Sequence, residues 1–384
     1  MRRLVAMVAA IVLVDTMFYA AIAPLLPYYS HHFHLAKSGA GVLAAAYAAG
    51  TLIGSLPSGW LAARFGVRKT VLSGLGMMVA ASVAFAFAHT VAFLDAARFV
   101  QGVGGSASWA AGLSWLMARA AGERRAELIG TALAAAIVGG LLGPVLGTAA
   151  SQSSPKLVFS LVGGLGLALA CWTLSEPAPA ASGSHGFGAL RPALRDRRLL
   201  AGMWLTTLGA LLFGTLSVLA PLRLDHLGAS EVAIGGAFLV AAAGAALSSP
   251  IVGRFTDRRG WRPPVLLGLS ASIVWMLLLP LPTSAALLFA IVAVADPFFG
   301  LSYPPAGAMI SDGAERAGLD QGYGFALFNL AWAGGQVVGN AGGAGLAQAT
   351  TDAVPYGLLA ALCAATLVVV VRRGGRTLPA SQLS

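Results

Sequence analysis

Long apolar runs separated by short polar segments dominate the chain. A helix needs about 20 apolar residues to span a hydrocarbon core of about 30 Å, because each residue advances the chain by about 1.5 Å. Twelve stretches meet this requirement, near residues 4–26, 40–61, 70–88, 91–117, 127–150, 156–175, 199–221, 231–253, 264–281, 285–310, 322–348 and 354–371. The pattern predicts an all-α membrane protein with twelve transmembrane helices.

The first run follows Met1-Arg2-Arg3, a beginning that also suits a secretory signal peptide. Because many equally long runs follow, we interpret it as an uncleaved first span.

Composition excludes several other classes. Apolar residues make up 58% of the chain and charged residues 10%, against roughly 25% charged in a soluble domain. The formal charge is +10, but the basic residues lie between apolar runs rather than on one face, so nucleic-acid binding is not expected. Cys171 and Cys363 lie in apolar stretches without metal or redox spacing. His31, His32 and His34 lie in one loop without supporting carboxylates, which favours a solvated loop over a metal site. We expect no cofactor and no metal.

The basic residues also predict the orientation, because Lys and Arg in short loops stay on the cytoplasmic side. With a cytoplasmic N-terminus, the inner loops and termini hold Arg2, Arg3, Arg64, Arg68, Lys69, Arg119, Arg124, Arg125, Arg191, Arg195, Arg197, Arg198, Arg254, Arg258, Arg259, Arg262, Arg316, Arg372, Arg373 and Arg376. The opposite loops hold only Lys37, Lys156 and Arg223, and Arg98 falls within the fourth span. We expect a multi-pass protein of the inner (plasma) membrane with both termini in the cytoplasm.

A polar interruption at 176–198 divides the chain into two bundles of six spans, 1–175 and 199–384. Its Pro, Ala, Ser and Gly residues are typical of a flexible cytoplasmic linker. The halves also repeat each other: Gly59, Arg64, Gly66 and Arg68 recur 194 residues later as Gly253, Arg258, Gly260 and Arg262, and Gly139-x-x-x-Gly143-Pro144 has a looser counterpart in Gly335-x-x-x-Gly339-Asn340. Parallel six-span repeats are typical of transporters that rock one half against the other.

Asp15 is the first candidate for chemistry, because it stands near the middle of the first span. An ionised Asp at that depth costs about 2.5–3.5 kcal/mol on insertion scales. It therefore either binds a proton or faces a cavity and meets a cation, and a group that alternates between these states makes a proton and a cationic substrate compete. The alternative is a neutral, hydrogen-bonded Asp that ties helices together.

Asp296 and Arg98 are the other intramembrane candidates. Asp296 lies near the middle of the tenth span, before Pro297, Pro304 and Pro305, which permit a broken helix where the backbone lines a cavity. It is either the ionisable site residue of the second half or a polar residue at a helix start. Arg98 either forms a local ion pair with Asp95 at i−3 or acts on the protonation of a neighbouring carboxylate.

Several motifs, in order along the chain, resemble those of the major facilitator superfamily. The segment Gly59 to Lys69 resembles the loop that braces the inward-closed state, Arg98 to Gly102 resembles a fourth-span motif linked with proton coupling, and Gly139 to Gly147 resembles the fifth-span signature of exporters and antiporters. The resemblance covers essentially the whole chain. It implies the major facilitator fold, with two pseudo-symmetric six-helix bundles.

The segment Asp15 to Pro27 is similar to the first span of drug:proton antiporters, especially the vesicular amine transporter branch, as is the later segment Pro305 to Gly343. The chain departs from that branch at several positions: Tyr47, Gly214 and Asn329 stand where it has Lys, Glu and Asp, and Gly300 stands where it has the tenth-span Asp, with Asp296 one turn earlier. Ala63 also replaces the usual Asp of the bracing loop, which survives in the second copy as Asp257.

From this resemblance we expect gating roles for Gly59, Arg64, Gly66, Arg68, Asp257 and Arg258, and for Gly143 and Pro144. Asp15, Asp296 and Arg98 are the expected proton-coupling residues. Tyr47, Trp109, Trp204, Trp332, Asn329 and Gln336 either line a cavity that holds an apolar cation or pack and anchor helices. The resemblance favours Tyr47 and Asn329, which with Asp15 and Asp296 form the expected substrate-binding set.

The sequence thus predicts a proton-coupled exporter of apolar or cationic small molecules, acting as a monomer in the lipid bilayer with protons as the coupling ion. One alternative is a pH-independent or symport carrier of a neutral or anionic metabolite. A polytopic lipid enzyme is less favoured, because the chain has no HExxH, GxSxG or phosphate-binding loop. A sensor or scaffold would need a larger soluble domain than the longest loop provides.

Overall fold

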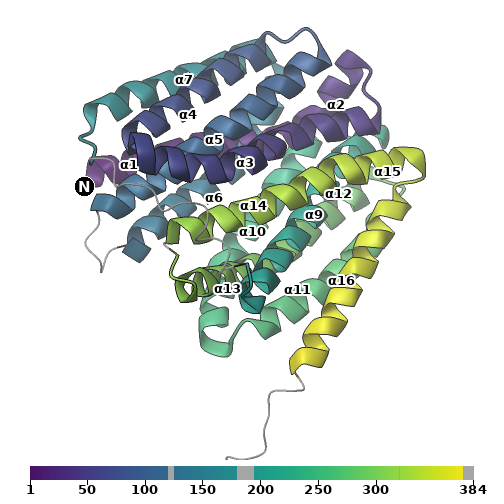
Figure 1. Cartoon of the computed structure of the whole chain (residues 1–384). Coiled ribbons are helices and arrows are strands. Elements are labelled where there is room, and N and C mark those ends of the chain that lie inside the picture. The colour runs from purple at the N-terminus through teal and green to yellow at the C-terminus, as the bar shows by residue number, and fades with distance from the viewer. Residues whose placement is uncertain (120–124, 180–193, 320, 375–384) are drawn as a thin grey trace, which may run out of the picture.

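The computed structural model describes residues 1–119, 125–179, 194–319 and 321–374 (Figure 1). Most of the predicted linker, residues 180–193, and the loop or terminal residues Arg124, Arg191 and Arg376 lie outside the described residues. The first half contains α1 (Arg2–Ala20), α2 (Ile22–Phe33), α3 (Lys37–Phe65), α4 (Val67–Ala86), α5 (Val91–Arg119), α6 (Arg125–Gln152) and α7 (Pro155–Ser175).

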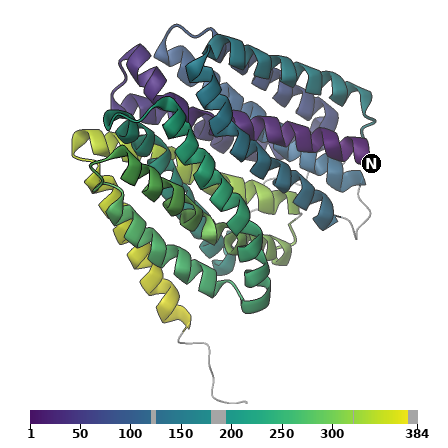
Figure 2. The same ribbon diagram turned by 180° about the vertical axis from the view of Figure 1, so that it is seen from behind.

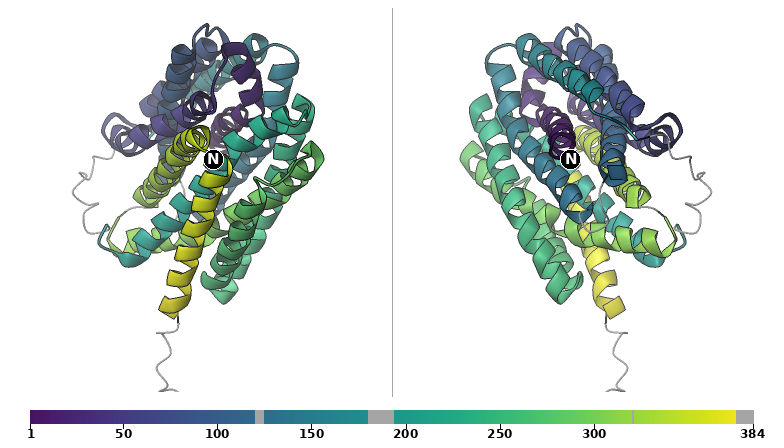
Figure 3. Two further views of the ribbon diagram at one scale, coloured as in Figure 1. Left: turned by 90° about the vertical axis from the view of Figure 1, so that its right-hand side faces the viewer. Right: turned by 90° about the vertical axis from the view of Figure 1, so that its left-hand side faces the viewer.

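The second half contains a matching series of helices: α9 (Arg197–His226), α10 (Glu231–Arg259), α11 (Arg262–Leu278), α12 (Ala285–Phe299), η3 (Gly300–Ser302), α13 (Tyr303–Arg316), α14 (Gln321–Val337), η4 (Val338–Gly342), α15 (Gly343–Ala349) and α16 (Ala353–Gly374). In Figure 1 the purple-to-blue first half lies above the teal-to-yellow second half, and Figures 2 and 3 show the same division from other sides.

The helices have the length and surface of a membrane protein. In the described part of the chain, nine helical segments are long and apolar enough to cross a membrane, and α11 is a shorter apolar helix. Two further spans are less apolar or less regular: α5 carries Asp95 and Arg98, and the segment from α14 to α15 is interrupted by the π-helix η4. Large apolar side chains cover the outside, with Leu247 71% exposed. Contact with lipid accounts for such exposure, and the predicted all-helical membrane fold is confirmed.

Three of the predicted spans are interrupted: the first is interrupted five residues before its predicted end, and the tenth and eleventh are interrupted near their middle. The first breaks at Ala21, between α1 and α2, with Pro24 and Pro27 just beyond it. The tenth breaks at η3 between Pro297 and Pro304, as the prolines predict, and the eleventh contains the five-residue π-helix η4. Such breaks free backbone groups and occur at membrane depth where the chain is buried in protein or lines a cavity.

Glycine seams hold one helix pair together in each half. On α6, a Cβ added at Gly139, Gly143 or Gly147 would lie within 3.0 Å of the α1 segment from Leu13 to Ala21. The segment from α14 to α15 packs as closely on α9: a Cβ added at Gly335, Gly339 or Gly343 would lie within 3.0 Å of the segment from Thr207 to Thr215. Small residues let membrane helices approach closely. Leu13 and Thr207 are 194 residues apart and the facing glycines are 196 apart, so the contacts repeat with the sequence to within two residues.

The turn after the second span of each half repeats at the same interval. Gly66 and Gly260 both have positive φ, of 92° and 82°, a conformation that glycine adopts without steric cost. Arg68 then donates a hydrogen bond to the carbonyl of Glu176 at the end of α7, and Arg262 donates to the carbonyl of Val370 in the last turn of α16. Each arginine thus caps the sixth span of its own half.

The halves contact each other through polar groups at one end of the molecule, near α2 and the α15–α16 connection, which we call the far end. Hydrogen bonds or ion pairs join His31 to Asp225, Lys37 to Asp352, Gln152 to Glu231, and the Ser38 amide to Gln348. The N-terminus and the last described turn of α16 lie at the opposite end, which we call the termini end (Figure 1). There the ion pairs among the described residues, Arg198–Asp312 and Arg316–Asp196, join helices of the second half only.

The glycine seam makes a prediction about stability. We expect Gly143→Ala to lower the thermal unfolding temperature of the purified protein, because its Cβ would lie 2.9 Å from the backbone carbon of Ala20, and overpacking typically costs about 1–3 kcal/mol. Gly130→Ala on the same helix is the matched control, since its Cβ would meet nothing within 4 Å. Equal unfolding temperatures for the two variants in detergent would contradict the seam.

Candidate functional site

Asp15 lies buried in the first half, between α1, α3 and α5. Its side chain is 2% exposed, and its Oδ2 atom accepts hydrogen bonds from the Tyr47 hydroxyl at 2.8 Å and from the Trp109 indole nitrogen at 2.9 Å. Tyr47 comes from the middle of α3 and Trp109 from α5, so the carboxylate ties three helices together. The structure thereby brings two of the predicted cavity residues to Asp15.

The second carboxylate oxygen of Asp15 has a different environment. Oδ1 is buried and makes no hydrogen bond within the described part of the chain. It faces Gly105 of α5, where an added Cβ would lie 2.5 Å from Oδ1. A buried acceptor without a partner is unfavourable by about 1–3 kcal/mol and is the atom where an added proton would settle with least rearrangement.

Arg98 organises the break between α1 and α2. It is 1% exposed, and its guanidinium donates to the carbonyls of Phe18 at 3.2 Å and Tyr19 at 3.3 Å and to Gln101 Oε1 at 2.8 Å. The alternative considered for Arg98, a local ion pair with Asp95, is not formed; Asp95 Oδ1 has no hydrogen-bond partner among the described residues. The guanidinium of Arg98 binds the carbonyls at the helix break instead of Asp95, which lies one turn earlier on α5.

Tyr19 connects the Asp15 cluster to the second half. Its ring contacts Tyr47, with centroids 5.0 Å apart, and packs edge-on against Trp332 of α14 at 5.2 Å. The guanidinium of Arg98 lies 5.3 Å from the centre of the Tyr47 ring, a cation–π contact. A cluster of aromatic rings with one cation therefore lies beside Asp15.

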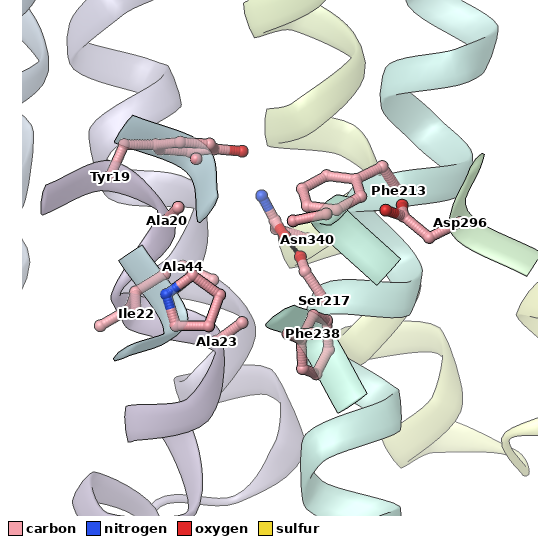
Figure 4. A pocket seen from close by; sticks show the side chains of 13 residues that line it. Tyr19, Ala20, Ile22, Ala23, Ala44, Phe213, Ser217, Phe238, Asp296 and Asn340 are labelled. Atoms are coloured by element: carbon pink, nitrogen blue, oxygen red, sulfur yellow. Dashed lines mark hydrogen bonds between the residues drawn. The ribbon is translucent and has the colours of Figure 1, made fainter. Parts of the chain in front are cut away.

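A small cavity between the halves contains the second acid. It is about 60 Å³ in volume and is lined by Tyr19, Ala20, Ile22, Ala23, Ala44, Gly140, Pro144, Phe213, Ser217, Phe238, Ala242, Asp296 and Asn340. Figure 4 shows Tyr19 and its neighbours on one side and Asp296, Phe213 and Asn340 on the other. At roughly 10–15 Å³ for each water in this measure, it has room for a few waters or one small polar group.

Asn340 supplies the amide of the cavity from the π-helix η4. Its Oδ1 accepts from the Ser217 hydroxyl at 3.0 Å, and its Nδ2 donates to Gln336 Oε1 at 3.1 Å. The Gln336 Nε2 atom is buried and has no acceptor within the described residues. The second half thus lines the cavity with amide and hydroxyl groups as well as with the Asp296 carboxylate. Asp296 is the twelfth residue of α12 and does not lie at a helix start.

The other predicted site residues have separate positions. Pro144 lines the cavity, and Gly143 packs against α1. Gly59 and Arg64 lie at the termini end of α3, where Arg64 rests on the rings of Trp60 and Phe65. In the second copy of the loop, Asp257 and Arg258 are exposed and form no ion pair with any described residue. Asn329 is half-buried on α14 and does not line the cavity.

Sequence reasoning did not single out Tyr19, Gly105, Phe325 or Asn340 as site residues. One signal existed for Tyr19, because it follows Asp15 by four residues and therefore shares its helix face. A second signal existed for Asn340, because it directly follows Gly339 in the second copy of the glycine motif. Phe325, which stacks on Trp109 across the two halves with centroids 5.6 Å apart, gave no such signal.

Comparisons with known proteins agree on one family. A family model described as "Major Facilitator Superfamily" matches residues 8–333 and 208–382. The chain is 25% identical over 382 residues to "Uncharacterized MFS-type transporter YcaD" of Shigella flexneri, with 94% of each chain covered. It is 33% identical over 139 residues to "MFS-type transporter ppzB" of Metarhizium majus, a match that spans 35% of this chain and only 30% of that relative.

Solved structures of transporters have the same fold. A D-xylose-proton symporter superposes with a TM-score of 0.74 at 17% identity, covering 95% of this chain and 96% of that one. A bacterial homologue of the human lysosomal transporter Spinster, in an inward-facing and unoccupied conformation, superposes with a TM-score of 0.76 at 15% identity, covering 97% and 95%.

The buried Arg98 network generates a second stability prediction. We expect Arg98→Ala to lower the thermal unfolding temperature in detergent, because it leaves the carbonyls of Phe18 and Tyr19 without this donor, and each hydrogen bond to a charged group contributes about 1.5–3 kcal/mol. The control is Asp95→Asn, which removes the nearest acid on α5 and leaves these bonds intact. A larger loss for Asp95→Asn than for Arg98→Ala would refute the assignment.

Proposed function

The chain belongs to the Major Facilitator Superfamily, and we propose that this membrane transporter exports apolar or cationic small molecules in exchange for protons by alternating access. Its resemblance to drug:proton antiporters in the first span supports the antiport part of the proposal. Asp15 and Asp296 carry the proton and meet the solute, and Arg98 fixes the geometry beside them.

The observation that carries this proposal is the environment of Asp15. Its carboxylate is buried, and among the described residues both of its hydrogen bonds go to Oδ2 and none to Oδ1. Arg98 makes no hydrogen bond to it, since its own bonds go elsewhere. An acid held without a full set of partners is stabilised by binding a proton and, once ionised, by an incoming cation.

Asp296 supplies the complementary group in the second half. It faces the cavity together with Tyr19, Phe213 and Phe238. Aromatic faces and one carboxylate suit an organic cation with an apolar body, because each ring attracts positive charge through its π face. The cavity is too small for such a solute as it stands, so binding requires the halves to separate at the termini end.

A second candidate function rests on Asn340 and Ser217. These side chains bring amide and hydroxyl groups to the same cavity, which suits a neutral hydroxylated metabolite. In that case Asp296 would accept a hydrogen bond from the solute, and the solute and the proton would be transported in the same direction, as in a symporter. Proton flux measured with neutral and cationic solutes separates the two candidates.

The same proposal includes organisation and orientation. We assign residues 1–175 and 199–384 to two six-helix bundles joined by a linker at 176–198, in a monomer of the inner (plasma) membrane. The termini end is the cytoplasmic end, so the polar contacts at the far end hold the transporter closed toward the outside. The exposed Arg64, Asp257 and Arg258 are then free to brace the termini end when the far end opens.

Orientation is tested with fused reporters. We expect green fluorescent protein at Ser384 to fluoresce and alkaline phosphatase at the same position to be inactive, because both termini are cytoplasmic. Phosphatase inserted after Ala88, in the connection between α4 and α5, is the matched control and should be active. An active phosphatase at Ser384 would reverse the proposed topology.

Transport is tested in proteoliposomes with the interior acidified and a pH dye inside. We expect ethidium or tetraphenylphosphonium to collapse the gradient with the wild-type protein, and Asp15→Asn to reduce this to the level of protein-free liposomes, because a neutral amide cannot bind or release the proton. Asp95→Asn is the matched control, because it neutralises another acid of the first half that forms no hydrogen bond with Asp15, Tyr47 or Trp109, and it should retain the response.

The alternative outcomes are equally specific. A gradient collapse caused only by neutral hydroxylated solutes would favour the second candidate. Full proton exchange by Asp15→Asn, in protein that unfolds at the wild-type temperature, would remove Asp15 from the mechanism.

A further inference from the structure

Trp109 makes two contacts that join the proposed proton site to the boundary between the halves. Its indole nitrogen donates to Asp15 Oδ2 at 2.9 Å. Its ring lies parallel to that of Phe325 on α14, with centroids 5.6 Å apart and planes inclined by 14°. The helix α5 belongs to the first half and α14 to the second (Figure 1). One side chain therefore contacts both the acid and the opposite bundle.

The stack lies between Asp15 and the termini end. Asp15 is the 14th residue of α1, which begins at that end, whereas Phe325 is the fifth residue of α14, which begins there too. At about 1.5 Å for each residue, these positions differ in depth by roughly 13 Å. Trp109 lies 10 residues before the end of α5 at the same side. The Trp109 ring therefore extends from Asp15 toward the termini end.

More apolar side chains continue this layer across the second half. Phe325 stacks on Phe328 at 6.4 Å, and Phe328 packs on Tyr303 of α13 at 6.2 Å. Leu56, from α3 of the first half, packs against the adjacent cluster around Leu327. We call Trp109, Phe325, Phe328, Tyr303 and Leu56 the aromatic layer. It contains side chains of both halves, so the layer separates when the halves part at the termini end.

The strength of the Trp109 bond depends on the charge of Asp15. An indole N–H is a donor only, and a hydrogen bond to an ionised carboxylate is roughly twice as strong as one to a neutral acceptor. A proton added at Oδ1, which faces Gly105 and has no partner in the described structure, leaves Oδ2 as the weaker acceptor of a neutral acid. Protonation therefore weakens the bond that holds the Trp109 ring in place.

Few other ionisable groups face Asp15 from the helices around it. Tyr47 of α3 donates to the same oxygen, and Arg98 of α5 lies against the Tyr47 ring. In its described part α6 approaches α1 most closely through the glycines at 139, 143 and 147, and α7 contributes Phe159 against Phe18. Asp15 is the acid of this group, so its proton governs the Trp109 bond.

We propose that Trp109 is a positioning residue that couples the protonation of Asp15 to the opening of the aromatic layer. With Asp15 ionised, the indole is held against Phe325, and the aromatic layer closes the path between the cavity and the termini end. With Asp15 protonated, the ring is released and the layer opens, which lets the proton leave and the solute enter. This proposal rests on the proton-coupled function above and adds the device that links charge to access.

The test measures access to the cavity through the termini end. Ala242→Cys, on the cavity wall, is introduced into a Cys171→Ala, Cys363→Ala background in inside-out vesicles. Labelling by a membrane-impermeant maleimide is measured across pH and divided by the rate for glutathione at the same pH. We expect a several-fold rise in normalised labelling on acidification, because protonated Asp15 releases the layer.

Variants separate the bond from the stack. Trp109→Phe keeps a ring against Phe325 but has no N–H, and its labelling should no longer change with pH. Trp115→Phe is the matched control, since it removes an indole N–H of the same helix that has no acceptor among the described residues and leaves the Asp15 bond and the stack, and should keep the pH response. Phe325→Leu keeps the N–H but loses the stack, and should label rapidly at every pH. Asp15→Asn should label at every pH as the acidified parent does.

The results distinguish this inference from the function on which it rests. If Asp15→Asn abolishes proton exchange while Trp109→Phe retains the pH response of the parent, the coupling by Trp109 is wrong and the transport proposal stands. Slow labelling of Phe325→Leu would show that the stack is not the barrier, and this result does not depend on Trp109→Phe folding. Normal proton exchange by Asp15→Asn would overturn the function itself.

Discussion

A carboxylate buried among apolar helices, with partners for only one of its oxygens in the described part of the chain, is the constraint on which the arrangement of the first half depends. Asp15 draws Tyr47 and Trp109 toward it, and Gly105 leaves space for its second oxygen. Burial makes each hydrogen bond to this acid stronger than it would be in water. For the same reason, the second oxygen, which lacks a partner among the described residues, is destabilising. The structure around Asp15 therefore suits two protonation states, each stabilised by different contacts.

Movement between such states requires halves that are rigid internally. The glycine seams of α6 on α1 and of α14 to α15 on α9 hold the first and fifth spans of each half in contact, and Arg68 and Arg262 each cap the sixth span of their own half. Contacts between the halves are polar and exposed at the far end, and aromatic at the Trp109–Phe325 stack. Close packing within each half and fewer contacts between them favour rigid-body rocking.

Hydropathy and repeat spacing were enough to predict the helical membrane fold, because the bilayer requires long apolar helices and both halves solve the same packing problem. They also identified Asp15, Arg98 and Asp296 as intramembrane ionisable residues. Partner choice was not predictable. Arg98 bonds to the carbonyls at the α1–α2 break instead of Asp95, and Asn340 rather than Asn329 lines the cavity. These outcomes depend on helix rotation and on the breaks at Ala21 and η4, which a hydropathy pattern does not encode.

The two acids occupy non-equivalent positions of the repeat, and the packing explains why. Gly209 stands 194 residues after Asp15, and Gly102 stands 194 residues before Asp296. An added Cβ at Gly102 would lie within 3.0 Å of the Tyr47 backbone, and one at Gly209 would lie 3.1 Å from the carbonyl of Phe299. Each half therefore has room for one acid at this level, on the first span in one half and on the fourth in the other. We infer a division of roles from this asymmetry, in which Asp15 contacts the aromatic stack between the halves and Asp296 faces the cavity.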